Sequence, residues 1–158
     1  MTFYIKQKFF SFRDKFFVYD SNGEGKYYVE GEVFSLGKKL HLYKNNGNRL
    51  ADIDQKFFSF LPRFAVTTAE GGCFEIVKNF TFFSPRYSVN PFGWTVFGNF
   101  FIHEYEVFDG ERSIVRVSKD WFSLGDAYKI EVRDEIDEVA ALSIVLVIDA
   151  CIDQQSNT

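Results

Sequence analysis

Two histidines are the side chains in this sequence most suited to acid–base chemistry or metal binding. His103 precedes Tyr105 by two residues in a strand-like pattern and is expected to face inward, whereas His41 alternates with Leu40 and Leu42 and is expected to face outward. Histidines that face opposite sides of a sheet make a poor metal site or acid–base pair. We therefore expect both histidines to be structural.

The other nucleophilic side chains form no catalytic pattern. Cys73 and Cys151 lack the spacing of a zinc site and are too few for a disulfide framework, so we expect reduced thiols that pack as small apolar groups. Serine recurs in repeated segments, which favours a turn or bulge role over a single nucleophile beside a base; these serines are Ser11, Ser35, Ser59, Ser84 and Ser123. The sequence predicts no enzyme, no cofactor and no metal; an enzyme with an unfamiliar kind of site is the alternative.

Positively charged residues follow the repeated Phe-Ser segments and are the candidate binding residues. They are Lys15, Lys38, Lys39, Arg63 and Arg86. Brought together on one rim, such cations could hold a phosphate, an anionic lipid head group or an acidic protein partner. The alternative is that they are solvated turn residues with no ligand. The choice between these two interpretations depends on the structural elements that position the five cations.

An internal repeat indicates what those elements are. An apolar-x-apolar pair occurs six times, and the first members of successive pairs are 24, 24, 23, 18 and 23 residues apart. The pairs are Phe16/Val18, Leu40/Leu42, Phe64/Val66, Tyr87/Val89, Tyr105/Val107 and Tyr128/Ile130. This period, with turn dipeptides such as Asn22-Gly23, indicates one β-hairpin per unit and hence about twelve antiparallel strands. The turns that follow the Phe-Ser segments should then emerge at one end of the sheet.

The C-terminal stretch does not follow the repeat. Residues 139–148, VAALSIVLVI, carry no charge, and ten residues are well short of the ~20 that a membrane span requires. Acidic residues before the run favour a helix, whereas its β-branched residues and the following Asp149 argue against one. About twelve strands close into a barrel too wide for their own side chains to fill, so this run is the expected plug.

Composition sets further limits. The chain of 158 residues fits one domain, which we place at 1–153, with a disordered tail at 154–158. Aromatic residues make up 20% of the chain, and the sequence contains 21 Phe. This composition predicts an interior rich in aromatic rings. A net charge of −4 argues against general nucleic-acid binding. Charges interrupt the first apolar residues before a signal-peptide core could form, so we expect a cytoplasmic protein with no transmembrane segment.

The repeated segments resemble a known family. KQKFFSF, YYVEGEVFSLGKKLHLY, DQKFFSFLPRF, FTFFSPRY and SKDWFSLGDAYKIEV, followed by the apolar terminal run, are similar to the LURP-one-related family, whose bacterial members are called YxjI-like. The resemblance extends from about Ile5 to Asp153. It implies a Tubby C-terminal-like fold: a mainly β, twelve-stranded closed antiparallel barrel around a central hydrophobic C-terminal α-helix. It implies no catalytic residues.

Two functions are therefore expected. The first is a non-enzymatic binding or regulatory module, with the barrel as a scaffold and its turns as the contact surface. The second is a membrane-peripheral protein that binds anionic phospholipid or phosphoinositide head groups through a basic rim, since relatives in the implied superfamily act on lipids. This chain lacks the cysteine cluster of the scramblases. A monomer is expected.

Overall fold

The computed structural model describes residues 1–6, 15–32, 36–120 and 127–156. The described residues form twelve strands, a short 3-10 helix and one α-helix. The elements are β1 (Thr2–Lys6), β2 (Phe16–Asp20), β3 (Gly25–Gly31), β4 (Lys39–Lys44), β5 (Arg49–Gln55), β6 (Arg63–Thr68), β7 (Cys73–Asn79), β8 (Arg86–Asn90), β9 (Trp94–Asn99), η2 (Phe100–Ile102), β10 (Glu104–Asp109), β11 (Arg112–Asp120), β12 (Ala127–Val132) and α1 (Glu138–Ser156).

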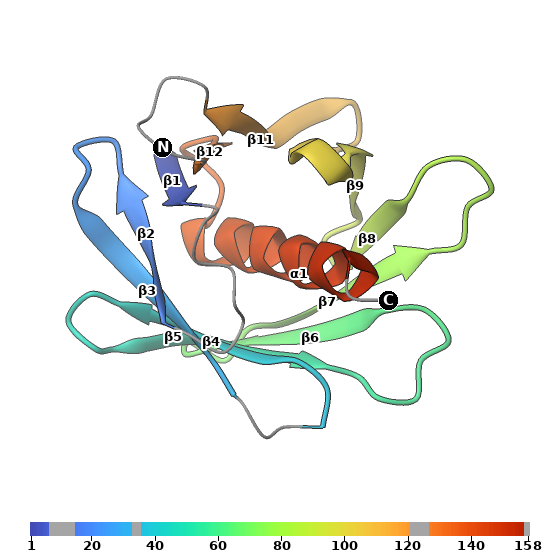
Figure 1. The fold of residues 1–158 in the computed structure, drawn as a ribbon, viewed down its shortest axis with the longest axis horizontal. Coiled ribbons are helices and arrows are strands. Elements are labelled where there is room, and N and C mark those ends of the chain that lie inside the picture. The colour runs from blue at the N-terminus through green and yellow to red at the C-terminus, as the bar shows by residue number, and fades with distance from the viewer. Residues whose placement is uncertain (7–14, 33–35, 121–126, 157–158) are drawn as a thin grey trace.

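The strands form one closed antiparallel barrel. Each strand pairs with its neighbours in the sequence, and β1 pairs with β12 to close the ring. The α-helix α1 lies inside this ring, surrounded by strands on all sides (Figure 1). The twelve strands, the antiparallel order and the central helix are all as expected from the repeat and the resemblance.

The predicted apolar pairs line the inside of the barrel. All twelve residues of the six pairs are buried, because alternate residues of a strand face the same side of the sheet. They pack against α1, where every residue from Ala140 to Cys151 is buried. A helix that is apolar on nearly every side is stable only when protein surrounds it. The barrel and the helix therefore bury each other.

The start of α1 is fixed by polar contacts. The Asp137 Oδ1 atom accepts a hydrogen bond of 2.7 Å from the backbone N–H of Ala140, as an N-cap residue does. Lys26 Nζ on β3 donates to Glu138 Oε2 at 2.9 Å. Burial acts to raise the pKa of Glu138, but hydrogen bonds from Tyr27 and Lys26 outweigh it and lower the pKa.

Two expectations are corrected. The sequence predicted a disordered tail at 154–158, but the helix continues through Gln154, Gln155 and Ser156, while 157 and 158 lie outside the described residues. Gln154 Nε2 donates to Gln55 Oε1 of β5 at 2.9 Å, and this contact favours a further helical turn. The interior also holds fewer rings than the composition predicted. Many phenylalanines lie instead on the surface, including Phe58 and Phe83, which are fully exposed.

Candidate functional site

The candidate site is one end of the barrel, which we call the loop end. It comprises the described parts of the β1–β2, β3–β4, β5–β6, β7–β8 and β9–β10 connections, together with the C-terminal turn of α1. The helix braces this end: Lys38, just before β4, pairs with Asp153, and Gln55 at the end of β5 bonds to Gln154. The opposite end, with the tight β2–β3 and β4–β5 turns, we call the turn end.

The five predicted cations all lie at the loop end, but most of them have acidic partners. Each stands just before or at the start of β2, β4, β6 or β8. Lys39 Nζ lies 3.5 Å from Asp54 Oδ1, and Lys38 pairs with Asp153. The pairs of Lys15 with Glu30 and of Arg63 with Glu75 are longer, at 3.8 Å each. The guanidinium of Arg86 lies 5.3 Å from the ring centre of Phe97. The rim is thus less positive than the cations alone suggest.

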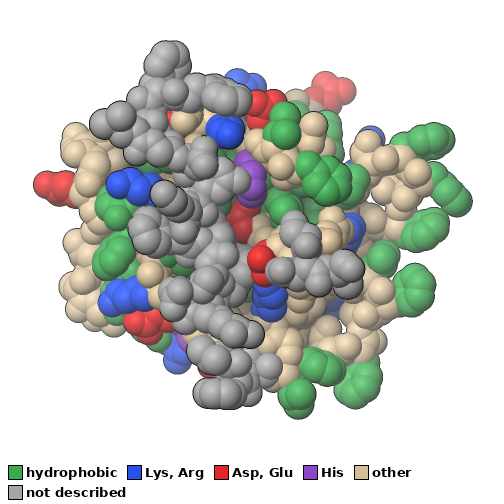
Figure 2. All heavy atoms as spheres, viewed as in Figure 1, with side chains coloured by type: hydrophobic (Ala, Val, Ile, Leu, Met, Phe, Trp, Pro, Cys, Tyr) green, Lys and Arg blue, Asp and Glu red, His purple; other side chains and the backbone are tan. Residues whose placement is uncertain are grey.

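Exposed phenylalanines are the most prominent feature of the loop end. Those in the β5–β6 connection are Phe57, Phe58 and Phe60, those in the β7–β8 connection are Phe80, Phe82 and Phe83, and η2 adds Phe101. Phe58 is 103% exposed, Phe60 96% and Phe83 99%, the range of a side chain that touches almost nothing. Figure 2 shows hydrophobic side chains standing out from the right-hand edge of the molecule. Monomeric proteins seldom expose several large apolar side chains together unless these side chains bind a ligand, a membrane or another protein.

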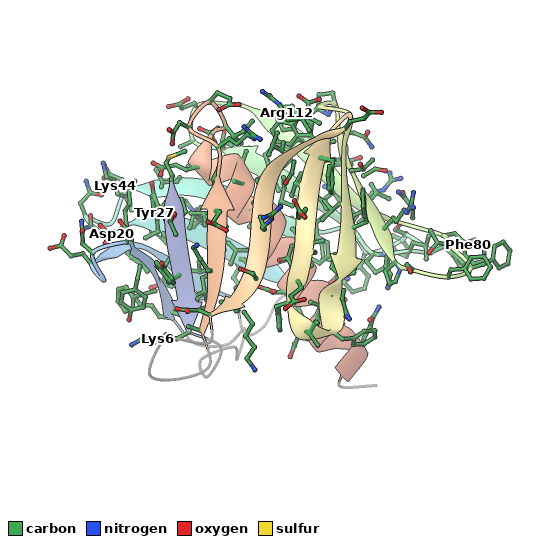
Figure 3. All side chains as sticks on the ribbon, turned by 90° about the horizontal axis from the view of Figure 1, so that it is seen from above. Lys6, Asp20, Tyr27, Lys44, Phe80 and Arg112 are labelled. Carbon is green, nitrogen blue, oxygen red and sulfur yellow. The ribbon has the colours of Figure 1, made fainter. Side chains whose placement is uncertain are left out.

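The two phenylalanine-bearing connections project from the barrel as separate tips. In Figure 3, Phe80 stands at the far tip of the β7–β8 connection, on the opposite side of the molecule from Lys44 and Asp20 of the turn end. The Phe80 and Phe82 rings pack edge to face, with their centres 5.2 Å apart. At the base of the other tip the Phe57 ring lies over Gly37, where a Cβ atom would come within 3.3 Å of it. The first tip is therefore supported at its base, and the ends of both tips are exposed.

A second polar feature lies inside the barrel near this end. Asp149 of α1 is buried, accepts a hydrogen bond from the Tyr128 hydroxyl and has Oδ1 3.4 Å from Nδ1 of His103. The His103 ring stacks on Tyr128 with ring centres 5.0 Å apart. The hydroxyl of Tyr105 is buried with no hydrogen-bond partner among the described residues. This cluster links α1 to the β9–β10 connection.

Burial controls the protonation of this cluster. Desolvation raises the pKa of the Asp149 carboxyl, although hydrogen bonds and charge from His103 and Tyr128 oppose the shift. Desolvation also raises the pKa of Tyr105 and Tyr128, and the charge of Asp149 adds to it. Burial raises the pKa of the Cys151 thiol to about 11. Tyr105, Tyr128 and Cys151 are therefore neutral near neutral pH, which suits a structural role more than proton transfer.

The two histidines lie apart, as expected. His103 follows η2 in a left-handed conformation with φ 54° and packs inward against Tyr128, whereas His41 lies on the outer face of β4. His41 Nδ1 is 2.6 Å from Asp52 Oδ1, and Nε2 is 2.7 Å from Glu32 Oε1. Each ring nitrogen of His41 is therefore within hydrogen-bond distance of a carboxylate. Among the described residues, no cluster of three or more His, Cys, Asp and Glu side chains is arranged to hold a metal ion.

Sequence reasoning missed the tips and the buried carboxylate. From the sequence, residues 56–60 and 80–83 are expected only as repeated segments ahead of the basic turns, yet they carry the exposed rings. The signal that could have found them is that both segments fall between strands and consist mostly of phenylalanine, which is not a usual turn residue. Lys56, which lies beside these rings, was also missed. In the part of the chain that the structure describes, no helix has the length and hydropathy needed to cross a membrane.

Comparisons with known proteins agree with this architecture. The sequence pattern of the LURP-one-related family matches residues 1–149. The chain is 35% identical over 146 residues to the uncharacterized protein YxjI of Bacillus subtilis (strain 168), covering 92% of this chain and 90% of that protein. A crystal structure of a protein from Arabidopsis thaliana aligns with a TM-score of 0.69 at 17% identity, covering 95% of this chain and 90% of that one, which shows a shared fold. The chain therefore belongs to the LURP-one-related family.

Proposed function

We propose that this protein is a non-enzymatic binding module that attaches to the surface of anionic membranes through the loop end of its barrel. The observation that carries the proposal is the pair of bare phenylalanine tips, one formed by Phe57, Phe58 and Phe60 and the other by Phe80, Phe82 and Phe83. Fully burying one Phe side chain contributes about 1.5–3 kcal/mol. Two or three inserted rings would therefore be enough to hold a protein at a membrane reversibly.

The shape of the loop end favours a membrane over a protein partner. A protein interface buries a continuous, closely packed surface with its aromatic residues near the centre. Here the rings stand on two separate projecting tips, and fluid lipid can surround each of them without a matching surface. Aromatic side chains are enriched at the membrane–water interface for the same reason.

The charges around the tips support an anionic surface. Lys56 and Arg63 flank the first tip, and Lys78 and Arg86 lie on the strands that carry the second. A Lys or Arg close to an anionic leaflet contributes about 1 kcal/mol. Because Arg63 also contacts Glu75 at 3.8 Å, its contribution is smaller. Insertion of the rings thus contributes more binding free energy than the charges do, and the charges add selectivity for anionic lipid.

Vesicle co-sedimentation tests the proposal. The full chain is mixed with vesicles of phosphatidylcholine alone or of phosphatidylcholine with phosphatidylglycerol. We expect binding to the mixed vesicles, weakened at least tenfold by the double change Phe58→Ser and Phe83→Ser. Phe92→Ser, at a partly exposed ring in the β8–β9 turn of the opposite end, is the matched control and should bind as the unchanged protein does.

Two results would contradict the proposal. One is failure of the unchanged protein to sediment with either vesicle at low salt. The other is equal sedimentation of the double variant and the control. Concentration-dependent self-association in the absence of lipid, abolished by the double change, would indicate instead that the tips contact a second protein chain.

A further inference from the structure

A pocket beside the first phenylalanine tip has the features of a head-group site. It has a volume of about 540 Å³ and is lined by Lys56, Ser59, Arg63, Glu75 and the three phenylalanines of that tip. Its size lies in the range of small-molecule sites. We propose that this pocket binds the phosphodiester group of an anionic glycerophospholipid, with Lys56 and Arg63 contacting the phosphate oxygens. This inference rests on the proposed function and names the lipid contact within it.

The hairpin geometry brings the two cations together. Lys56 directly follows β5, and Arg63 begins β6. The backbone N–H of Lys56 donates to the carbonyl of Arg63 at 2.8 Å, so the two residues face each other across the stem of the loop. Residues opposite each other in an antiparallel pair have Cβ atoms about 4.5–5.5 Å apart. Two long cationic side chains from such positions can reach the same phosphate.

These two cations are less strongly paired with carboxylates than Lys38 and Lys39 are. Lys38 and Lys39 are committed to Asp153 and Asp54. Lys56 has no carboxylate within ion-pair distance among the described residues, and the Arg63–Glu75 contact of 3.8 Å is near the outer limit for an ion pair. Arg and Lys are the usual partners of phosphate oxygens, Arg because its fork contacts two oxygens at once. A phosphate can therefore bind here without breaking a short ion pair.

The balance of charge selects the kind of phosphate. Two cations and one carboxylate, Glu75, give the pocket a net charge of 2 − 1 = +1. A phosphodiester carries a single negative charge and matches this balance. A phosphomonoester carries about −1.5 to −2 near neutral pH and would meet uncompensated repulsion from Glu75. The pocket is thus suited to a lipid such as phosphatidylglycerol.

The depth of the pocket also fits a membrane-bound molecule. A strand advances about 3.3 Å per residue, so Phe58 can reach roughly 7 Å beyond Lys56, and Phe60 at the tip no more than about 10 Å beyond the cations. The polar head-group layer on each side of a bilayer is roughly 5–8 Å thick. Rings at the edge of the hydrocarbon would therefore place Lys56 and Arg63 among the phosphates.

Single charge-removing variants test the inference in the full chain. We compare Lys56→Gln with Lys44→Gln, which removes the same charge from the turn end. Lys56→Gln should weaken binding to phosphatidylglycerol-containing vesicles about fivefold and leave binding to pure phosphatidylcholine vesicles unchanged. Glu75→Gln should strengthen binding to the anionic vesicles. Lys44→Gln should change neither.

Three outcomes separate the possibilities. If the unchanged protein binds no vesicle, the proposed function fails and this inference with it. If it binds but Lys56→Gln and Lys44→Gln behave alike, the membrane contact stands and the pocket assignment is overturned. If inorganic phosphate, at matched ionic strength and without lipid, shifts the Lys56 side-chain NMR signals as strongly as vesicles do, the ligand is free phosphate and the lipid assignment is overturned.

Discussion

The Nδ1 atom of His103 lies 3.4 Å from Oδ1 of Asp149, so a residue that follows η2 contacts a buried carboxylate inside the barrel, near the loop end. His103 adopts φ 54°, a conformation that costs non-glycine residues energy and persists only when its surroundings hold it. Stacking on Tyr128 and the contact with Asp149 provide that support. The preceding residues Phe101 and Ile102 are exposed, so this contact anchors part of the loop end to α1.

Replacement of Asp149 by Asn should change how stability depends on pH. Burial raises the pKa of Asp149 in the folded state above the unfolded value of about 3.9. Between the two values the folded protein holds a proton that the unfolded chain has lost, so this group's contribution to the free energy of unfolding falls as pH rises through that window. Asparagine carries no charge to desolvate and still accepts a hydrogen bond from Tyr128. Urea unfolding from about pH 4 upward should show the variant gaining stability relative to the parent. Parallel curves would contradict this account.

Removal of the helix cap should weaken the fold modestly. Asp137 accepts a hydrogen bond from the backbone of Ala140 at 2.7 Å, and loss of such a cap costs about 1 kcal/mol. Thermal unfolding of Asp137→Ala should therefore show a lower midpoint, while Glu111→Ala in an exposed turn should not. An equal midpoint for the two variants would show that the cap contributes nothing.

Truncation of the helix core should cost more. Leu142 is fully buried where α1 packs against the barrel, and Leu→Ala at such sites costs about 2–5 kcal/mol because a cavity remains. Val139, one turn earlier, is only partly buried, so Val139→Ala should cost clearly less. Denaturant unfolding of both variants measures the difference. A similar loss for both would mean that the barrel collapses around the smaller side chain.

The barrel could be predicted from the sequence because its signal is repeated and local. Each apolar pair, such as Leu40/Leu42, places two side chains on one face of a strand, and six copies define the inward direction for the whole ring. The turns follow from residues that tolerate positive φ, as at Gly47, where φ is 90°. The helical form of the terminal run came from the resemblance, because its β-branched residues left the local signal undecided.

The candidate site could be predicted only in part. The positions of Lys38 and Arg63 at one end follow from strand connectivity, but their acidic partners do not, since Asp153 comes from α1 and Glu75 from a neighbouring strand. In the sequence, Asp149 is only a residue after the apolar run that argues against a helix. Only the tertiary fold places it beside His103 and Tyr128. Contacts between residues far apart in sequence leave no periodic signal.

Substitution of Gly98 should be among the most damaging changes in the barrel wall. Gly98 has φ 152°, and a Cβ atom there would lie 2.5 Å from the carbonyl oxygen of Glu104 and from Cα of Tyr105. Both neighbours are backbone atoms of β10 and can move only by breaking the β9–β10 ladder. Gly110→Ala is the control. Gly110 has φ 61° and open space around it, so its replacement incurs only the conformational cost of about 1–2 kcal/mol and no steric clash. We expect Gly98→Ala to lose more stability than this control in denaturant unfolding, and the reverse order would contradict the geometry.

Both phenylalanine tips should contribute to membrane affinity, while neither should contribute appreciably to the stability of the fold. Phe58 and Phe83 are fully exposed, so replacing either by Ser should change the free energy of unfolding by no more than about 0.5 kcal/mol. Their contributions to membrane binding should add, because they stand on different connections and share no contact. If both tips insert at once, the double variant should lose a factor in vesicle affinity close to the product of the two single losses. If only one tip reaches the bilayer, one single variant should bind like the parent and the double variant like the other single variant. Vesicle titrations of the four proteins distinguish a two-point attachment, which fixes the orientation of the barrel axis, from a single contact about which the barrel can rotate.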